Sequence, residues 1–170
     1  MDRRAVHEQW ERDRVTFRAL LAAATADDLR RPSRGTRWTN RQLLFHMLFG
    51  YQVVRALHML VRLAGRLPDP VSHAFARALD AGTPLFDLVN YLGSRGGGLL
   101  GPRLMAWWFD RIIGSLHRRL DRTGEADLER GMHYPARWDP FFAPRMTLAD
   151  VYRYPARHFA FHQRQLTLAA

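Results

Sequence analysis

Hydrophobic residues recur at intervals of three and four along most of the chain, which is the spacing of an amphipathic helix. The first apolar stripe comprises Val6, Trp10, Phe17, Leu20, Leu21 and Ala24. The second comprises Leu43, Met47, Tyr51, Val54, Leu57 and Val61. The sequence lacks the sustained alternation of apolar and polar residues that would indicate strands. Four long helices are therefore predicted, over residues 2–24, from 39 to near Gly65 and Pro68, 102–121 and 147–168.

The boundaries of these helices carry capping residues. Thr39 and Gln42 have the spacing of a capping box, and Thr147 and Asp150 repeat it at the start of the last helix. Pro102 suits the first turn of the third long helix, because proline needs no amide hydrogen there. The apolar row of that helix, expected to face the core, comprises Trp107, Trp108, Ile112, Leu116 and Leu120.

The segment over residues 68–101 is less regular. Two short helices are predicted within it, over about 71–80 and 84–92, followed by the glycine cluster SRGGGLLGP. No strand precedes these glycines and no Gly-Lys-Ser/Thr follows them, so a phosphate-binding loop is not expected and a flexible connection is. The fold class predicted is an all-α four-helix bundle with extra short helices in the 68–101 connection. At 170 residues the chain is expected to form one domain, over residues 1–170.

Composition narrows the chemistry. The chain has no cysteine, so it can form no disulfide and supply no thiolate ligand or cysteine nucleophile. All 26 basic residues are arginine and the formal net charge is +10, which favours anionic ligands. The arginines are spread along the chain without a nucleic-acid-binding motif, so nucleic acid is not expected as a partner. With no apolar leader and no long apolar run, a cytoplasmic protein that does not enter membranes is expected.

Two histidines, His158 and His162, lie four residues apart in ARHFAFHQRQL near the C-terminus. Side chains at this spacing share one face of a helix and can converge on one metal ion. The segment lacks the glutamate of HExxH, because Arg157 precedes His158 and Phe159 follows it. On its own the pair is compatible with a metal site or with two ordinary polar residues.

A third histidine favours the metal site. His46 falls on the inward row of the second predicted helix, so it faces the bundle interior. Three imidazoles on two helices, with one position left for water, match the composition of a catalytic zinc-type site. Nitrogen ligands suit Zn, Ni, Fe or Cu better than Mg or Ca. Pro155 is the complication, because a proline inside the last helix predicts a kink or a restart there, and a restart would leave His158 facing the core.

The other histidines are assigned other positions. His58 is expected to lie at the periphery, about 120° around the helix from His46. His117 is expected to be packed, and His7 to lie at the surface. His133 is a candidate for the rim of a pocket.

Two segments resemble the DinB-like superfamily of four-helix bundles, which includes the YfiT-type proteins. They are WTNRQLLFHM at 38–47 and TLADVYRYPARHFAFHQRQL at 147–166. In that family a tryptophan precedes a capped helix with an inward histidine, and a later helix carries HxxxH followed by glutamine and leucine. The resemblance implies that His46, His158 and His162 occupy the three metal-binding positions. Residues 68–101 are less familiar and are a candidate for an added lid.

The resemblance also implies a range of activities. Characterised members of the family include enzymes that use mycothiol or bacillithiol, either isomerising maleylpyruvate or transferring the thiol to electrophiles. A metal-dependent enzyme with Zn or Ni and a small-molecule substrate is therefore expected. It would act as a low-molecular-weight-thiol-dependent S-transferase or as a hydrolase, using a metal-activated thiol or water. The alternative is a non-enzymatic helical protein that binds a ligand or partner and has no functional metal; a homodimer through exposed helix faces is compatible with both.

Overall fold

The structure is a computed structural model that describes residues 1–169. Its elements in chain order are α1 (Arg3–Ala23), α2 (Ala26–Arg30), α3 (Asn40–Ala64), α4 (Asp69–Ala81), α5 (Thr83–Gly97), α6 (Pro102–Asp121), α7 (Glu125–Glu129), β1 (Gly131–His133), β2 (Arg145–Thr147) and α8 (Leu148–Gln163). The predicted all-α bundle with additional helices is confirmed. The four helices predicted to be long are α1, α3, α6 and α8.

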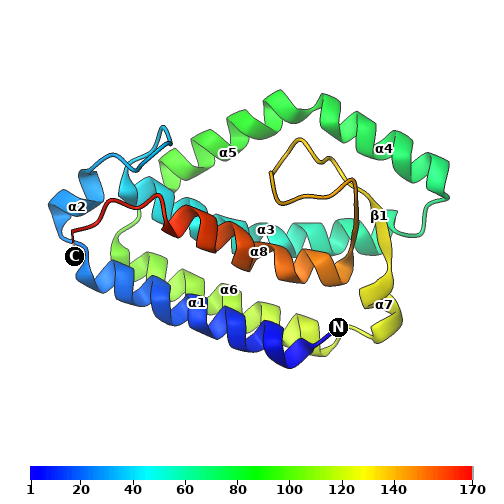
Figure 1. The fold of residues 1–170 in the computed structure, drawn as a ribbon, viewed down its shortest axis with the longest axis horizontal. Coiled ribbons are helices and arrows are strands. Elements are labelled where there is room, and N and C mark those ends of the chain that lie inside the picture. Colours follow the sequence, from blue (N-terminus) through cyan, green and yellow to red (C-terminus); the bar gives the residue numbers. More distant parts are fainter. Residues whose placement is uncertain (170) are drawn as a thin grey trace.

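These four helices form the bundle, with α1 packed against α6 and α3 packed against α8 (Figure 1). α1 and α8 run in one direction, and α3 and α6 run in the other. The core between them contains the largest fully buried side chains, including Trp10, Phe17, Tyr51, Phe109 and Tyr152. The apolar stripe predicted for the second helix is buried along its whole length, so the period of the pattern identified the correct face.

Both predicted capping boxes are present. The Thr39 side chain accepts a hydrogen bond from the Gln42 amide, and the Gln42 side chain accepts one from the Thr39 amide. Thr147 and Asp150 make the same reciprocal pair at the start of α8. These bonds satisfy amides that a helix start leaves free, and they set where α3 and α8 begin.

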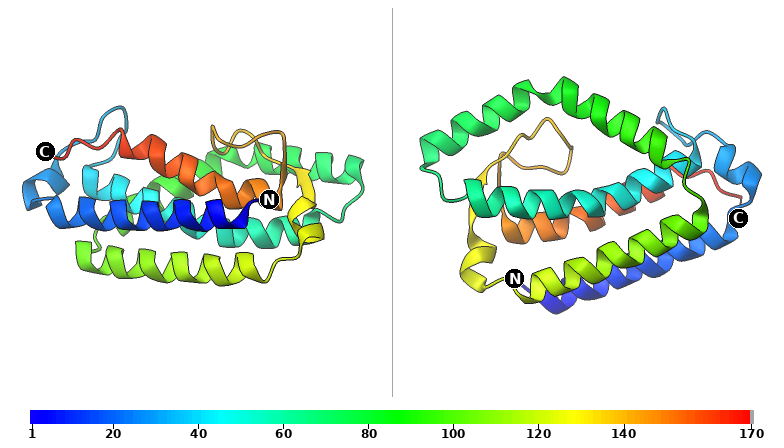
Figure 2. Two further views of the ribbon diagram at one scale, coloured as in Figure 1. Left: turned by 60° about the horizontal axis from the view of Figure 1, so that its bottom comes forward. Right: turned by 180° about the vertical axis from the view of Figure 1, so that it is seen from behind.

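α4 and α5 form an arch on the side of α3 and α8 that faces away from α1 and α6 (Figures 1 and 2). The prediction of a flexible glycine connection after residue 92 is wrong, because α5 continues to Gly97. A Cβ atom at Gly97 would lie 2.2 Å from the Phe45 ring, and one at Gly98 would lie 2.6 Å from the Gln42 side chain. These glycines therefore let the end of α5 approach the backbone of α3 closely.

The proline-rich connection contains structure that the apolar pattern did not predict. β1 and β2 pair antiparallel, with Met132 opposite Met146, and both of these side chains are buried. The loop between them, residues 134–144, lies under the arch (Figure 1). Trp138 in this loop stacks on Phe86 of α5, with ring centroids 4.3 Å apart, and donates from Nε1 to the Leu79 carbonyl at 3.0 Å. The loop is thus held to the inner side of α4 and α5.

α8 runs without a break from Leu148 to Gln163, through Pro155. The predicted restart at Pro155 is therefore wrong, although His158 faces the core as expected, with 2% of its surface exposed. The helix also ends earlier than residue 168. The segment after it folds back onto the start of α3, where the Asn40 side chain donates to the Asp28 carbonyl and accepts from the Thr167 amide.

The buried face of α6 differs from the predicted one. Trp107 is 56% exposed, so the inward row of α6 runs instead through Met105, Phe109, Ile112, Leu116 and Leu120.

By length and composition, one helix in the described part of the chain, α3, is apolar enough to cross a membrane. Of the window that qualifies, 61% is buried inside the fold, which is the situation of a core helix.

Candidate metal centre

His46 on α3 and His158 and His162 on α8 meet where these two helices pack together. Nε2 of His158 lies 3.1 Å from Nε2 of His46. The three imidazole centroids are 4.4–4.8 Å apart. One nitrogen from each ring lies within 4.8 Å of the other two. The three histidines singled out in the sequence are therefore brought to one point, where they could hold a metal ion.

Gly50 makes this approach of α8 to α3 sterically feasible. It lies one turn after His46 on α3, and a Cβ atom at position 50 would be 2.5 Å from Nδ1 of His158. Real Cβ atoms essentially never lie that close to another heavy atom. The His158 ring therefore occupies the space that a side chain at position 50 would need.

Two of the three rings are oriented by a second partner. Nδ1 of His46 hydrogen-bonds the buried Ser94 hydroxyl of α5 at 3.1 Å, and Nδ1 of His162 donates to Oε1 of Gln165 at 2.7 Å. The Trp38 ring also packs on His46, with centroids 4.4 Å apart. Metal-binding histidines commonly carry such a partner on the nitrogen that does not bind the metal. Ser94 lies outside the motifs that pointed to the histidines, so sequence reasoning missed it.

Burial favours the neutral form of all three imidazoles. Burial, with a smaller contribution from His162, lowers the pKa of His46 to about 3. Burial and the two neighbouring rings lower the pKa of His158 well below its usual value, and burial lowers the pKa of His162. A neutral imidazole has the free nitrogen lone pair that a metal ion requires.

The arrangement fits a divalent transition metal. In a tetrahedral zinc site with Zn–N bonds of about 2.0–2.1 Å, neighbouring ligand nitrogens lie about 3.3 Å apart. The 3.1 Å between the two Nε2 atoms of His46 and His158 is close to that separation. Nδ1 of His158 is buried and has no hydrogen-bond partner among residues 1–169. Any polar interaction of the His158 ring therefore has to be made through Nε2.

A carboxylate that sequence reasoning missed lies beside these ligand atoms. Oδ2 of Asp139 is 3.9 Å from Nε2 of His158. Tyr154 donates to the same Oδ2 at 2.8 Å, and the Phe141 amide donates to Oδ1 at 2.8 Å. Burial raises the pKa of Asp139. The WDPFF stretch contains this aspartate, but a loop has no periodicity from which its contact with α8 could have been inferred.

The histidines form one wall of a pocket of about 290 Å³. The pocket lies between α3, α5, α8 and the 134–144 loop, so residues from the lid predicted at 68–101 do line it. Its walls are mostly apolar, formed by Phe49, Val53, Leu57, Phe86, Trp138, Phe141 and Phe142. Among its lining residues Asp139 carries the carboxylate and Asn90 a neutral amide. A small, largely apolar molecule in this pocket would therefore lie against the three histidines.

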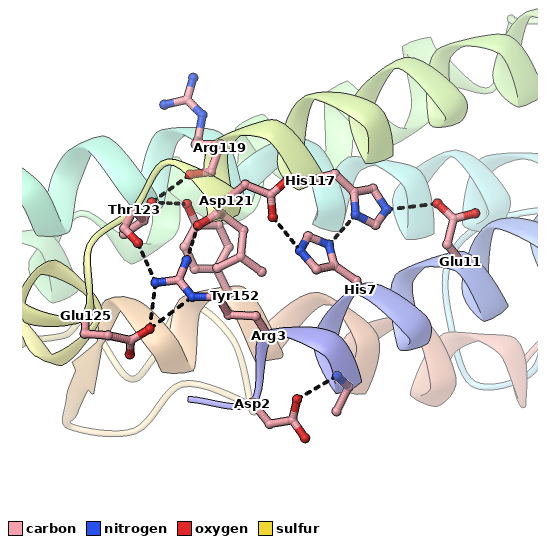
Figure 3. Close-up of polar contacts among 12 residues, drawn as sticks. Asp2, Arg3, His7, Glu11, His117, Arg119, Asp121, Thr123, Glu125 and Tyr152 are labelled. Atoms are coloured by element: carbon pink, nitrogen blue, oxygen red, sulfur yellow. Dashed lines mark hydrogen bonds and ion pairs between the residues drawn. The ribbon is translucent and has the colours of Figure 1, made fainter.

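Four further histidines with positions predicted from the sequence do not line this pocket. His58 is buried at 2% exposure and hydrogen-bonds the Tyr152 hydroxyl at 2.7 Å, so its expected peripheral position is wrong. His133 contacts Asp69 at 3.1 Å and does not line the pocket. His7 and His117 contact each other through Nδ1 in a polar network between α1 and α6 (Figure 3).

Comparison with known proteins supports the same assignment. The family described as the DinB superfamily matches residues 9–166, which is most of the chain. A search of curated proteins and a search of solved structures each found no match. The matched range includes all three histidines and Asp139. The chain belongs to the DinB superfamily.

Proposed function

Proceeding from this membership, we propose that the protein is a metal-dependent enzyme that transfers a low-molecular-weight thiol to a small, largely apolar electrophile. The observation that carries the proposal is the position of three neutral, converging imidazoles on the wall of an apolar pocket. His46, His158 and His162 would hold the metal, with Zn or Ni as the expected ion. Because the chain has no cysteine, the thiol would come from a separate small molecule.

When bound, a divalent transition metal would lower the pKa of a coordinated thiol or water and so supply a nucleophile near neutral pH. Asp139 is the proton acceptor that we assign to the reaction, since Oδ2 lies 3.9 Å from Nε2 of His158. Its raised pKa brings its proton affinity closer to neutrality, which suits a general base. Tyr154 and the Phe141 amide hold the carboxylate in place.

The pocket walls select the second substrate. Phe86 and Trp138 stack on each other in the pocket wall, and Phe141 also lines the pocket. An apolar electrophile would bury apolar surface against these rings, and the low local dielectric would strengthen the charge interactions at the histidines. Hydrolysis by a metal-activated water is the second candidate reaction, and the carboxylate beside the ligand atoms is the feature that favours it.

Elemental analysis of tag-free protein tests the metal site. We expect close to one equivalent of a transition metal in the wild type, and its loss in His46→Ala, His158→Ala and His162→Ala. His133→Ala serves as the matched control, since His133 lies outside the pocket, and it should retain the metal. A sub-stoichiometric metal content that is the same in the wild type and in the three histidine variants would contradict the proposal and favour a non-enzymatic binding protein.

Asp139→Asn then separates chemistry from metal binding. The amide preserves the shape of the side chain and should leave the metal content near one equivalent. Turnover of a small aromatic electrophile with a low-molecular-weight thiol should fall by a factor of about 10²–10⁴, the usual contribution of a general base. Thiol-independent hydrolysis in the metal-loaded wild type would assign the second candidate reaction instead. Equal turnover in the variant and the wild type would remove Asp139 from the mechanism.

A further inference from the structure

A second cleft, separate from the metal centre, lies where the ends of α3 and α6 meet α7. Its volume is about 350 Å³ and its lining is mostly polar. His58 of α3 lines it, and since His58 follows His46 by twelve residues, the two sites lie about 18 Å apart along the helix. The cleft shares no lining residue with the pocket described above.

Four arginines surround this cleft: Arg62, Arg118, Arg119 and Arg122. None of the four forms an ion pair with a carboxylate within the described residues, whereas Arg3 nearby is paired with Glu125 at 2.8 Å. Figure 3 shows the Arg119 guanidinium extending away from that paired network. The arginines thus present guanidinium groups that are not paired with any carboxylate of residues 1–169.

One acidic residue lines the cleft, and it is already engaged. Asp127 lies 2.7 Å from the Arg130 guanidinium. Four guanidinium groups around a single, already paired carboxylate leave a strong excess of positive charge. Such an excess, in a concave site, favours a compact anion with more than one negative charge.

The floor of the cleft offers a neutral donor. The Thr123 hydroxyl donates to the Arg119 carbonyl at 2.7 Å, so its proton is used there. The Tyr152 hydroxyl lies 2.7 Å from Nδ1 of His58 and 3.3 Å from the Thr123 hydroxyl, so Nδ1 of His58 is engaged within the fold. In the tautomer that carries its proton on Nε2, His58, which lines the cleft, can donate to an oxygen of a bound anion.

We propose that this arginine cleft binds the phosphoryl group of a phosphorylated small molecule. A phosphate monoester carries about 1.5 to 2 negative charges and three acceptor oxygens near neutral pH. Guanidinium groups match those oxygens in pairs, which is why arginine clusters are a common means of phosphate recognition. The His58 imidazole supplies a further donor from the floor.

Titration calorimetry with inorganic pyrophosphate tests the proposal in metal-free, full-length protein and phosphate-free, low-salt buffer. Removing the metal keeps the histidine centre from binding the anion. We expect one binding site per chain, and about tenfold weaker binding in each of Arg62→Gln and Arg118→Gln, because each loses a charged hydrogen-bond donor. Both side chains are exposed, and circular dichroism would check that both variants fold.

Arg55→Gln is the matched control, because it removes the same charge from an exposed position on α3 outside the cleft. It should leave pyrophosphate affinity unchanged. No binding to the wild type would overturn the proposal and leave the arginines with a role at the helix ends alone. Equal weakening in Arg55→Gln would show a general charge effect and overturn the site, and citrate binding as tight as pyrophosphate binding would overturn the phosphoryl assignment.

Discussion

The space between α3 and α8 at position 50 has room for the His158 ring but not for a side chain at position 50 as well. In the structure the His158 ring lies where the Cβ atom of any other residue at position 50 would be, 2.5 Å from its Nδ1. Only 2% of the His158 surface is exposed, so the ring cannot turn outward without leaving the core. Geometry at the metal centre thus depends on a residue with no functional group.

Gly50→Ala is expected to weaken metal binding although all three histidines remain. The added methyl group must displace His158 or separate α3 from α8, and overpacking of this kind destabilises proteins by about 1–3 kcal/mol. Metal affinity measured by competition with a chelator, together with urea unfolding, would detect both effects. Gly93→Ala is the control, because no atom lies within 4 Å of a Cβ at that helical position, and it should stabilise the protein by about 0.5–1 kcal/mol. Unchanged metal affinity in Gly50→Ala would contradict the packing argument.

His58 is expected to make the protein less stable in mild acid. Burial, with smaller contributions from Arg119 and Arg62, lowers the pKa of His58 to about 4. A histidine in the unfolded chain titrates near 6.5, so its stabilising contribution is present above that pH and is lost as the pH falls toward 4. Tyr152 and Asp127 are the other titratable groups that face it or contribute to its pKa.

The measurement is urea unfolding of the wild type and His58→Asn between pH 7.5 and 4.5 in phosphate-free buffer. Asparagine keeps a polar partner for the Tyr152 hydroxyl and does not titrate. Allowing for solvent screening, the wild type should lose about 1–2 kcal/mol more than the variant over this range. Parallel pH profiles for the two proteins would show that His58 does not contribute.

At the level of single residues, the sequence located the three converging histidines but not their surroundings. His46, His158 and His162 lie on regular helices, where a period of 3.6 residues determines which side chains share a face. Asp139 lies in an irregular loop, and Ser94 lies in a segment whose glycines hid its helical pattern. Their contacts with the histidines arise from tertiary packing, which no local spacing encodes.

α5 is the element whose role the sequence left least clear. Its last turn and C-cap together carry three consecutive glycines, which are poor helix formers and favour the prediction of a loop. Packing against α3 outweighs that preference, because Gly97 lets the helix backbone approach the Phe45 ring. α5 also supplies Ser94, Asn90 and Phe86 to the region around the pocket. Its docking on α3 therefore positions both a partner of His46 and part of the pocket wall.

Gly97→Ala is expected to loosen α5 from α3. A Cβ at this position would lie 2.2 Å from a buried aromatic ring, so the helix end or Phe45 must move. Hydrogen exchange of the α5 amides should become faster, and the unfolding free energy should fall by about 1–3 kcal/mol. Gly96→Ala, one residue away and with no atom within 4 Å of its Cβ, should leave exchange unchanged or slow it, because alanine favours the helix more than glycine does. Equal exchange in both variants would argue against tight docking.

For the molecule as a whole, removal of the metal is expected to lower thermal stability. A ligand present at a hundred times its dissociation constant stabilises the folded state by about 2.7 kcal/mol. In a domain of this size that corresponds to a fall of about 5–10 °C in the unfolding midpoint when a chelator is added. Scanning calorimetry would measure the change, and His46→Ala, which lacks a ligand, should unfold at the same temperature with and without the chelator. A wild type insensitive to chelation would contradict a structural contribution from the metal.

The position of the arch gives the metal centre a further property. The helices before the arch carry His46, and those after it carry His158 and His162. The centre is thus divided between two halves of one chain, much as a shared site is divided between two subunits. A gene split between α4 and α5 would separate the half-sites onto two fragments, neither of which holds all three ligands. Recovery of zinc binding on mixing the fragments would then report reassembly of the bundle itself.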